Sequence, residues 1–363
     1  MAFQAPSCAA VGAEKAPENQ LRVAGENESS ALPDISPSCT PPLTIARTCG
    51  NGRADVAGKA PAGRGRTTVP GEERGGRALS GRCKLGPMAA REQARHWRYP
   101  ELPGVDLLRA RYISKTFIRH THETFVIAAI TDGVEVFHHG GSDRYAGPGS
   151  LALVNPDTPH TGHAQGPEGW RYGAVYPSPG LVAEIAAETT RISGTPGFVE
   201  PVVDDPYAVR LVHRVLRAAD EGNALAADTL LRVAVTRLLR LNGAALPRRT
   251  ARGAGARTAA RARAVLERRL ADPPSLERLA AELGTGPFAL LRAFKDAYGM
   301  PPHTWLTDAR VRRARHLLDA GTAPAEVAGL VGFTDQPHLN RHFTRIVGVP
   351  PGAYRKERAP GGS

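Results

Sequence analysis

The stretch Leu279-Ala280-Ala281-Glu282-Leu283-Gly284 decides the fold, because a close copy of it, Val327-Ala328-Gly329-Leu330-Val331-Gly332, follows later in the chain. The first copy continues as Leu290-x-Arg292-x-Phe294 and then Gly299-Met300-Pro301-Pro302-x-x-Trp305. The second continues as Leu339-x-Arg341-x-Phe343 and then Gly348-Val349-Pro350-Pro351-x-x-Tyr354. A repeat of this period indicates that one supersecondary unit occurs twice between residues 275 and 355.

Each copy predicts two helices joined by a tight turn. In the first copy, Ser275 is expected to cap a short helix whose leucines recur at helical spacing, and Gly284 supplies a residue that tolerates positive φ at its end. Leu290 and Phe294 then form the inward stripe of a second helix. In the second copy Gly332 makes the turn, and Thr334 is the expected cap of the following helix.

The outward faces of the two second helices carry cationic and hydrogen-bonding side chains. A single helix of about 25 Å is predicted between the copies, over residues 304–320, and it could hold the two units about one DNA turn apart. A short helix, a turn with glycine and a helix with a cationic outer face are typical of a helix-turn-helix DNA reader. The alternative is a packing domain whose exposed face merely carries charge, but the matching positions of Arg292 and Arg341 favour DNA binding.

These residues resemble the AraC/XylS family of bacterial transcription regulators over about 100 residues at the C-terminus. The resemblance is carried by Gly332-Phe333-Thr334-Asp335-Gln336 together with the Leu-x-Arg-x-Phe and Gly-x-Pro-Pro motifs that follow it. The chain departs from the family pattern at Gly286, where a capping serine is common, and at Pro337, where a polar residue is common. The resemblance implies that both second helices enter successive major grooves of double-stranded DNA.

Base edges and phosphates are the expected targets of the outward residues. Arginine pairs with guanine edges, polar side chains add further contacts, an apolar side chain such as Phe288 meets a thymine methyl, and lysine or arginine holds phosphates. The predicted DNA-binding residues are Phe288, Ala289, Arg292, Lys295, Gln336, His338, Asn340, Arg341, Arg345 and Arg355.

Charge is divided unevenly along the 363 residues, whose formal net charge is +12. Residues 258–363 hold 16 basic against 10 acidic side chains, and residues 243–257 hold 4 against none, whereas residues 88–242 are nearly neutral. The excess of positive charge therefore lies where a polyanionic partner is expected to bind.

Residues 1–87 are rich in Gly, Pro, Ala and Arg without helical or strand periodicity, so we expect a disordered low-complexity extension. All four cysteines lie in it, with no zinc-type spacing, and no apolar run suits export or membrane insertion, so a cytoplasmic protein is expected. Met88 stands just before the first stretch with a folded pattern, and translation could begin there. The alternative is a translated but disordered tail.

The middle of the chain, residues 88–180, predicts short strands separated by turns. Runs at 125–131, 134–138, 151–154 and 170–176 alternate with turn residues, and Asp132-Gly133 is a strong hairpin signal. This texture predicts a small antiparallel β-barrel. Arg119-His120-Thr121-His122 and Asn155-Pro156-x-x-Pro159-His160 resemble the cupin sensor domain of many family members, which implies a small-molecule effector.

Three histidines are the candidate ligand-binding residues of this domain: His120, His122 and His160. The first two are two residues apart, so on a strand they face the same side. A three-imidazole metal site is one interpretation. Metal-binding cupins place a glutamate shortly after the second histidine, where this chain has Val126 and Ile127, so we expect no metal and no cofactor, and histidines that hydrogen-bond a ligand or each other.

Helices are predicted at 181–191, 206–220 and 226–241, where they either cover the barrel or form a dimer seam, and residues 243–257 are expected to be a basic flexible linker. The sequence as a whole thus predicts an α+β two-domain chain. It comprises a cupin-like sensor at 88–180, covering or dimerising helices at 181–242, and an all-α domain with two helix-turn-helix motifs at 258–358.

The predicted function is sequence-specific DNA binding under the control of a small-molecule effector, without enzymatic activity. The resemblance implies a homodimer that acts on RNA polymerase as an activator, although the residues do not themselves give the sign of regulation. A cupin oxygenase or isomerase fused to a DNA-binding domain is the alternative, disfavoured by the missing glutamate. An architectural DNA binder is a third, disfavoured by the separate neutral domain.

Overall fold

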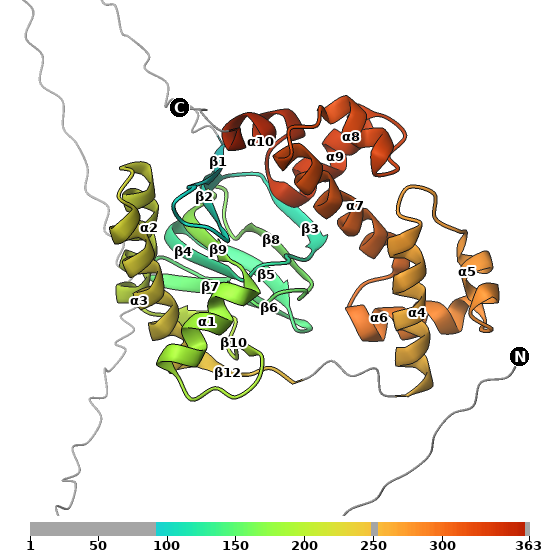
Figure 1. Cartoon of the computed structure of the whole chain (residues 1–363), viewed down its shortest axis with the longest axis horizontal. Helices are drawn as coiled ribbons and strands as arrows, with labels where there is room; N and C mark the ends of the chain where they lie inside the picture. Colours follow the sequence, from blue (N-terminus) through green and yellow to red (C-terminus); the bar gives the residue numbers. More distant parts are fainter. Residues whose placement is uncertain (1–91, 248–252, 360–363) are drawn as a thin grey trace, which may run out of the picture. The chain divides into compact units, whose positions relative to one another are not determined.

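The structure is a computed structural model that describes residues 92–247 and 253–359 (Figure 1). The extension predicted at 1–87 lies outside these residues. Within them, no helix has both the length and the apolar character needed to cross a membrane.

Two antiparallel sheets form the first part of the described chain. The larger has the strand order β1-β2-β9-β4-β7-β11 and the smaller the order β3-β8-β5-β6. The larger sheet contains β1 (Gln93–Arg98), β2 (Val105–Tyr112), β4 (Val126–Gly133), β7 (Ser150–Val154), β9 (Trp170–Pro177) and β11 (Val202–Asp204). The smaller contains β3 (Thr116–His120), β5 (Glu135–His139), β6 (Ser142–Ala146) and β8 (His160–Ala164).

This arrangement corrects the expected barrel, because no ladder among the described strands joins the two sheets into a closed cylinder. It also corrects the hairpin expected at Asp132-Gly133, since β4 pairs with β7 and β9 while β5 pairs with β6 and β8. Gly133 has φ +66°, and a Cβ there would lie 2.0 Å from the carbonyl oxygen of Gly169. The glycine therefore permits a close approach of two backbones where the chain passes between sheets.

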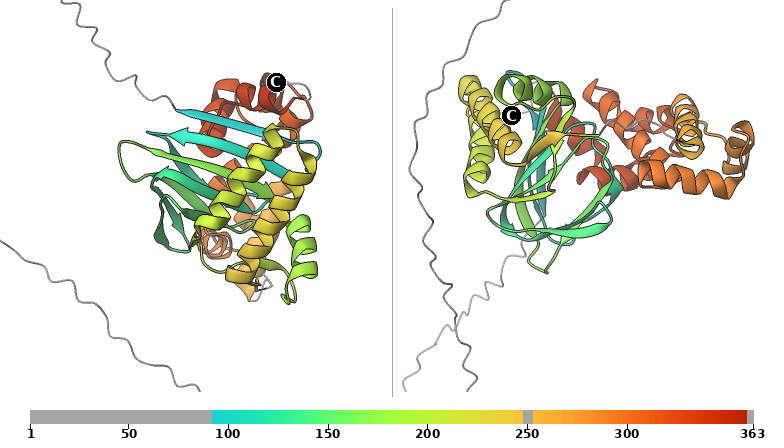
Figure 2. Two further views of the ribbon diagram at one scale, coloured as in Figure 1. Left: turned by 90° about the vertical axis from the view of Figure 1, so that its left-hand side faces the viewer. Right: turned by 90° about the horizontal axis from the view of Figure 1, so that it is seen from below.

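Both faces of the larger sheet are buried. Successive side chains of a strand point to opposite faces, so neighbouring residues enter different cores. Leu107, Ile127 and Val175 belong to a core shared with three helices, whereas their neighbours Leu108 and Ala128 belong to a second core. The helices are α1 (Pro179–Thr189), α2 (Pro206–Asp220) and α3 (Ala224–Asn242), close to the predicted ranges. Figure 2 shows α2 and α3 side by side across the sheet.

The remaining helices are α4 (Ala254–Arg268), α5 (Leu276–Glu282), α6 (Pro287–Tyr298), α7 (Pro302–Asp319), α8 (Pro324–Leu330), α9 (Gln336–Val347) and α10 (Pro351–Arg358). They enclose two apolar cores. Trp305 and Ala309 of α7 pack with α4 to α6, whereas Val311 and Leu318 of the same helix pack with α8 to α10. The long helix α7 thus connects two small helical bundles, as the sequence predicts.

The basic segment at 243–257, predicted to be a flexible linker, includes a short strand and the first turn of a helix. Residues Gly243–Ala245 form β12, which pairs with β10 (Pro196–Phe198), and α4 already begins at Ala254. A Cβ on Gly243 would lie 2.3 Å from the carbonyl oxygen of Leu239, so the glycine allows the chain to leave α3 in close contact with it. The alanine-rich start of α4 favours helix.

Candidate DNA-reading surface and sensor cavity

The helix pair α5 and α6 presents the first predicted set of DNA-binding residues to solvent. The Ser275 hydroxyl accepts a hydrogen bond from the backbone N–H of Arg278 at 3.3 Å, so the predicted cap is confirmed. Leu290 and Phe294 are fully buried. This packing leaves the other side of α6 exposed, with Phe288 at 81% exposure and with Ala289, Arg292 and Lys295 also exposed.

The helix pair α8 and α9 repeats this arrangement. Leu339 and Phe343 are fully buried, and the opposite face of α9 exposes Gln336, Arg341 and Arg345. Thr334 was the expected cap, but the Asp335 carboxylate performs this role by accepting a hydrogen bond from the backbone N–H of His338 at 2.6 Å. A carboxylate caps well because it also faces the positive end of the helix dipole.

Three of the predicted DNA-binding residues are less accessible than the others. His338 is half-buried and its ring lies 5.1 Å from that of Phe333, which orients it. Asn340 is half-buried, and its side-chain oxygen has no hydrogen-bond partner among the described residues. Arg355 is half-buried on α10 and donates a hydrogen bond to the backbone oxygen of Gly321 at 3.2 Å. By contrast, Arg292 and Arg341 form no hydrogen bond or ion pair within the described residues.

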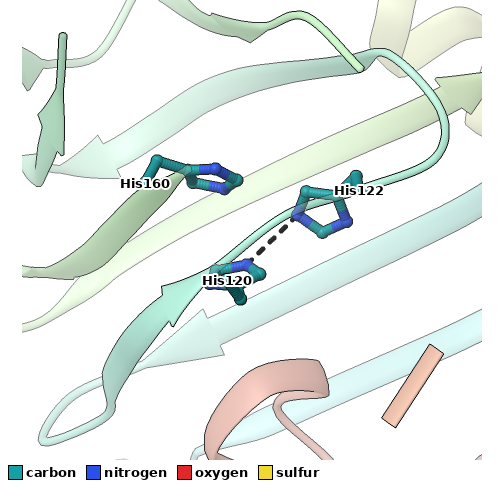
Figure 3. Close-up of side chains that lie close together, drawn as sticks. All are labelled: His120, His122 and His160. Atoms are coloured by element: carbon teal, nitrogen blue, oxygen red, sulfur yellow. Dashed lines mark hydrogen bonds between the residues drawn. The ribbon is translucent and has the colours of Figure 1, made fainter. Parts of the chain in front are cut away.

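The predicted histidines come together at one end of the smaller sheet. His120 on β3 is paired with His160 on β8, and His122 follows β3 directly. Figure 3 shows the three rings turned toward one another, with a hydrogen bond of 3.2 Å between the Nε2 atoms of His120 and His122. Burial lowers the pKa of all three imidazoles, those of His122 and His160 well below the ordinary value of 6.5, so the group is neutral at pH 7.

These histidines line a cavity between the two sheets that sequence reasoning could outline only in part. Phe117, Phe137 and Ala128 supply apolar walls, and Tyr172 and Tyr176 supply hydroxyl groups. Glu135 also lines it without a hydrogen bond or ion pair among the described residues, and burial raises the pKa of its carboxyl to about 7. Its inward direction follows from the register of β5, which the sequence did not reveal.

Helices α7 and α9 contribute to the same cavity, a feature that the sequence gave no signal for. Its lining includes Val311, Arg312 and Arg315 of α7 and Ile346 and Val347 of α9. A helix predicted only to connect the two repeats therefore also contacts the candidate ligand site.

Polar contacts fix α7 against the sheets beside this cavity. The Thr121 hydroxyl donates to Asp308 at 2.6 Å, and Asp308 is fully buried. Burial raises the pKa of Asp308 despite its proximity to Arg312. On the other side, Asp106 of β2 forms ion pairs with Arg315 at 3.0 Å and with Arg358 at 2.8 Å. Burial alone would raise the pKa of Asp106, but these guanidinium groups hold it below its usual range.

Comparison with known proteins assigns both parts of the chain. Residues 102–235 match the AraC-like ligand binding domain, and residues 279–357 match a helix-turn-helix domain. The transcriptional activator NphR of a Rhodococcus species is 30% identical over 66% of this chain and 72% of its own length. The uncharacterized HTH-type transcriptional regulator YbfI of Bacillus subtilis is 25% identical over 65% of this chain and 86% of its own length.

Among solved structures, ToxT from Vibrio cholerae is similar with a TM-score of 0.45 and 13% identity, covering 74% of this chain and 98% of ToxT. A ligand-binding domain followed by a helix-turn-helix domain defines a DNA-binding transcriptional regulator rather than an enzyme. The chain belongs to the AraC family of transcriptional regulators.

Proposed function

We propose that this regulator binds a specific DNA sequence with both helix pairs, and that a small molecule in the sensor cavity controls the binding. The observation that carries this proposal is the composition of the cavity wall, because residues of the sheets and of helices α7 and α9 line one cavity. A ligand that changes the packing of α7 changes the support of both helix pairs, since α7 belongs to both helical cores.

The two second helices, α6 and α9, are the proposed recognition helices. Arg292 and Arg341 are exposed and have no hydrogen bond or ion pair with another described residue, so their guanidinium groups are available for guanine edges. Lys295 and Arg345 are exposed one turn further along each helix and are suited to phosphates. Gln336, His338, Asn340, Phe288 and Ala289 complete the proposed reading face, and Arg355 supports its edge from α10.

The chemistry of the cavity favours an uncharged or anionic effector with an apolar portion. Neutral imidazoles and tyrosine hydroxyls supply hydrogen bonds, Arg312 and Arg315 supply positive charge, and phenylalanine side chains face an apolar group. Such a ligand lies beside Thr121 and perturbs the hydrogen bond from Thr121 to Asp308, which joins the segment after β3 to α7.

We also propose a homodimer formed through α3, with RNA polymerase as a further partner. Leu225, Val233 and Leu241 of α3 are at least 43% exposed, and Tyr207 of the neighbouring α2 is 45% exposed. An apolar surface on the helices that cover a sheet suits association with a second copy.

A cavity-filling variant tests the effector site. Ala152 is 4% exposed and lines the cavity, so Ala152→Leu occupies ligand space without altering a polar group. Compounds that raise the melting temperature of the full chain in a screen of organic acids and neutral metabolites supply the effector. We expect these compounds to change the anisotropy of labelled operator DNA with the wild-type chain and not with Ala152→Leu. An unchanged dose response in the variant would place the effector elsewhere.

A further inference from the structure

The histidine cluster contains more lone pairs than hydrogens to satisfy them. Nδ1 of His120 lies 2.7 Å from the backbone oxygen of Ile118, and Nδ1 of His160 lies 3.0 Å from that of Thr158. A carbonyl oxygen only accepts, so both Nδ1 atoms must carry the hydrogen. In a neutral imidazole the other nitrogen, Nε2, then presents a lone pair.

His122 does not resolve this surplus. Its Nε2 lies 3.2 Å from Nε2 of His120, and a neutral His122 has one N–H to donate. That hydrogen can be donated to the lone pair on Nε2 of His120. The lone pair on Nε2 of His160 then receives no hydrogen from His122.

We propose that His120, His122 and His160 bind one divalent transition-metal ion of the zinc class through their ring nitrogens, with a remaining coordination position open to the sensor cavity. The three ligand atoms lie within 4.8 Å of one another. Tetrahedral zinc with Zn–N distances of about 2.0–2.1 Å places its nitrogens about 3.3 Å apart, close to the observed 3.2 Å between His120 and His122. This proposal departs from the sequence-based expectation that the histidines hold no metal.

The backbone supports the rings as the outer contacts of metal-bound histidines do. The carbonyl oxygens of Ile118 and Thr158 fix the tautomer and the orientation of two rings, each from two residues earlier in its own chain segment. Imidazole ligands favour zinc, copper, nickel or cobalt over magnesium and calcium, which prefer oxygen.

The lack of a carboxylate in the cluster gives the bound ion a distinct chemistry. Glu123, the acidic residue next to His122, is exposed and accepts a hydrogen bond from His316 at 2.9 Å, so it is engaged away from the rings. Three neutral ligands do not compensate the 2+ charge of the ion, and Glu135, which lines the same cavity, is not among the grouped ligand atoms. The open position therefore favours an anionic fourth ligand, such as a carboxylate or thiolate of an effector.

This inference deepens the proposed sensor function and rests on it only for the consequence in regulation. Thr121 stands between the two ligands His120 and His122, and its hydroxyl bonds Asp308 of α7. An ion that fixes the two rings also fixes the backbone that carries Thr121.

The test uses the full chain with its four cysteines, Cys8, Cys39, Cys49 and Cys83, alkylated by iodoacetamide so that thiolates do not bind the metal. Zinc content is measured after dialysis against zinc and then buffer, and affinity by competition with a zinc indicator. The variants are His120→Asn and His160→Asn, and the matched control is His138→Asn, whose ring instead bonds Asp143 at 2.9 Å. Circular dichroism confirms that each variant is folded.

We expect one zinc ion per chain for the wild type and for His138→Asn, with affinity reduced roughly tenfold or more in His120→Asn and His160→Asn. X-ray absorption at the zinc edge of the wild type provides a readout independent of variants, and should show imidazole scattering with Zn–N at about 2.0–2.1 Å. A wild-type chain that retains no zinc, equal zinc affinity in all variants, or a spectrum without imidazole would overturn the site.

Measurements of DNA binding on the same protein samples distinguish failure of the metal site from failure of the proposed regulatory function. Specific DNA binding by a chain that retains no zinc removes the metal site alone. Zinc bound by the three histidines in a chain without sequence preference removes the regulatory function and leaves the metal site.

Discussion

At the scale of single residues, we propose that DNA specificity depends on side chains that have no partner among the described residues. Arg341 is exposed on α9 without a hydrogen bond or ion pair among the described residues, and Arg292 is exposed in the same way on α6. An arginine that makes two hydrogen bonds to guanine discriminates between bases, whereas one that holds a phosphate does not.

We predict that Arg341→Ala weakens binding to the preferred DNA by about 1–3 kcal/mol and relaxes base preference at one position. Arg214→Ala is the control, because Arg214 is exposed on α2 and its replacement removes the same charge. Fluorescence anisotropy on preferred and scrambled DNA measures both effects. Equal losses on the two DNAs would make Arg341 a phosphate contact instead.

His96 gives a pH dependence whose sign is set by burial. Burial, with the charges of Arg315 and Arg358, lowers its pKa from 6.5 to about 3, against the opposing effect of Asp106. Its Nε2 donates to the backbone oxygen of Val347 at 3.0 Å, a contact that the neutral ring makes. A lowered pKa in the folded state means that this stability is complete above about pH 6.5 and is lost as the pH falls toward 3.

We therefore predict that His96→Gln, which keeps a hydrogen-bond donor but does not titrate, reduces the acid sensitivity of the protein. Between pH 6 and 4 the wild type should lose up to about 1.4 kcal/mol of unfolding free energy per pH unit more than the variant. Urea denaturation at each pH provides the values. Parallel pH profiles for the two proteins would show that His96 titrates normally in the folded state.

At the scale of elements, the two helix pairs differ in the surroundings of their turns. Gly284 has φ +67° with no atom within 4 Å of an added Cβ, whereas Gly332 has φ +85° and its Cβ would lie 2.4 Å from the carbonyl oxygen of Ala271. The second turn is thus packed against the segment that follows α4, and the first is open to solvent.

This difference predicts unequal costs for the same substitution. Gly284→Ala introduces the strain of a side chain at positive φ, which costs about 1 kcal/mol. Gly332→Ala introduces the same strain and must also displace the backbone of Ala271. We expect the melting temperature to fall clearly further for Gly332→Ala. Equal shifts in differential scanning calorimetry would mean that the turn of α8 and α9 does not contact residue 271.

The helical region from Ala254 to Arg358 is predicted to fold alone and to bind DNA as a monomer. It contains both apolar cores, and its first helix is needed because Ala259 and Ala262 of α4 are fully buried. Hydrogen exchange should show protected amides in α7 and in both helix pairs, and sedimentation should show one chain per particle. A fragment without protected amides would mean that contact with the sheets is required for folding.

Local patterns predicted the elements better than their assembly. The repeat, the long helix α7, the Ser275 cap and the shared side of His120 and His122 follow from spacing within one or two elements, whereas His160 was grouped with them by the resemblance to cupin sensor domains. The hairpin at Asp132-Gly133 was wrong because Gly133 serves a close approach to Gly169, a partner distant in sequence. Thr334 and Asp335 are adjacent potential caps, and only the helix geometry selects between them.

Several residues that line the cavity could not be predicted from local sequence patterns either. Glu135 and Tyr176 reach it through strand register, and Arg315 of α7 lies in its wall beside Asp106 of β2, with which it forms an ion pair. None of these long-range contacts leaves a periodic signal in the sequence. The prediction of a closed barrel was wrong for a related reason, since short strands separated by turns are compatible both with a cylinder and with two facing sheets.

At the scale of the whole molecule, α7 connects the cavity between the sheets to both helix pairs, because it lines the cavity and belongs to both helical cores. Asp106 and Asp319 together hold Arg98, Arg315 and Arg358 in ion pairs of 2.6–3.0 Å that link β1, β2, α7 and α10. Thr121 and Asp308 hold the other side of α7. We propose that these contacts transmit the effect of a ligand at the sheets to both helix pairs.

The most direct test of this account is selection of bound sites from random double-stranded DNA by the full chain. Because α7 spans 18 residues, or about 27 Å, between the two helix pairs, we predict two preferred sequence blocks about 10 base pairs apart within one binding site. Arg341→Ala should remove the preference within one block and retain the other. A pool without any enriched sequence after repeated rounds would contradict sequence-specific DNA binding, and a single block would contradict its reading by both helix pairs.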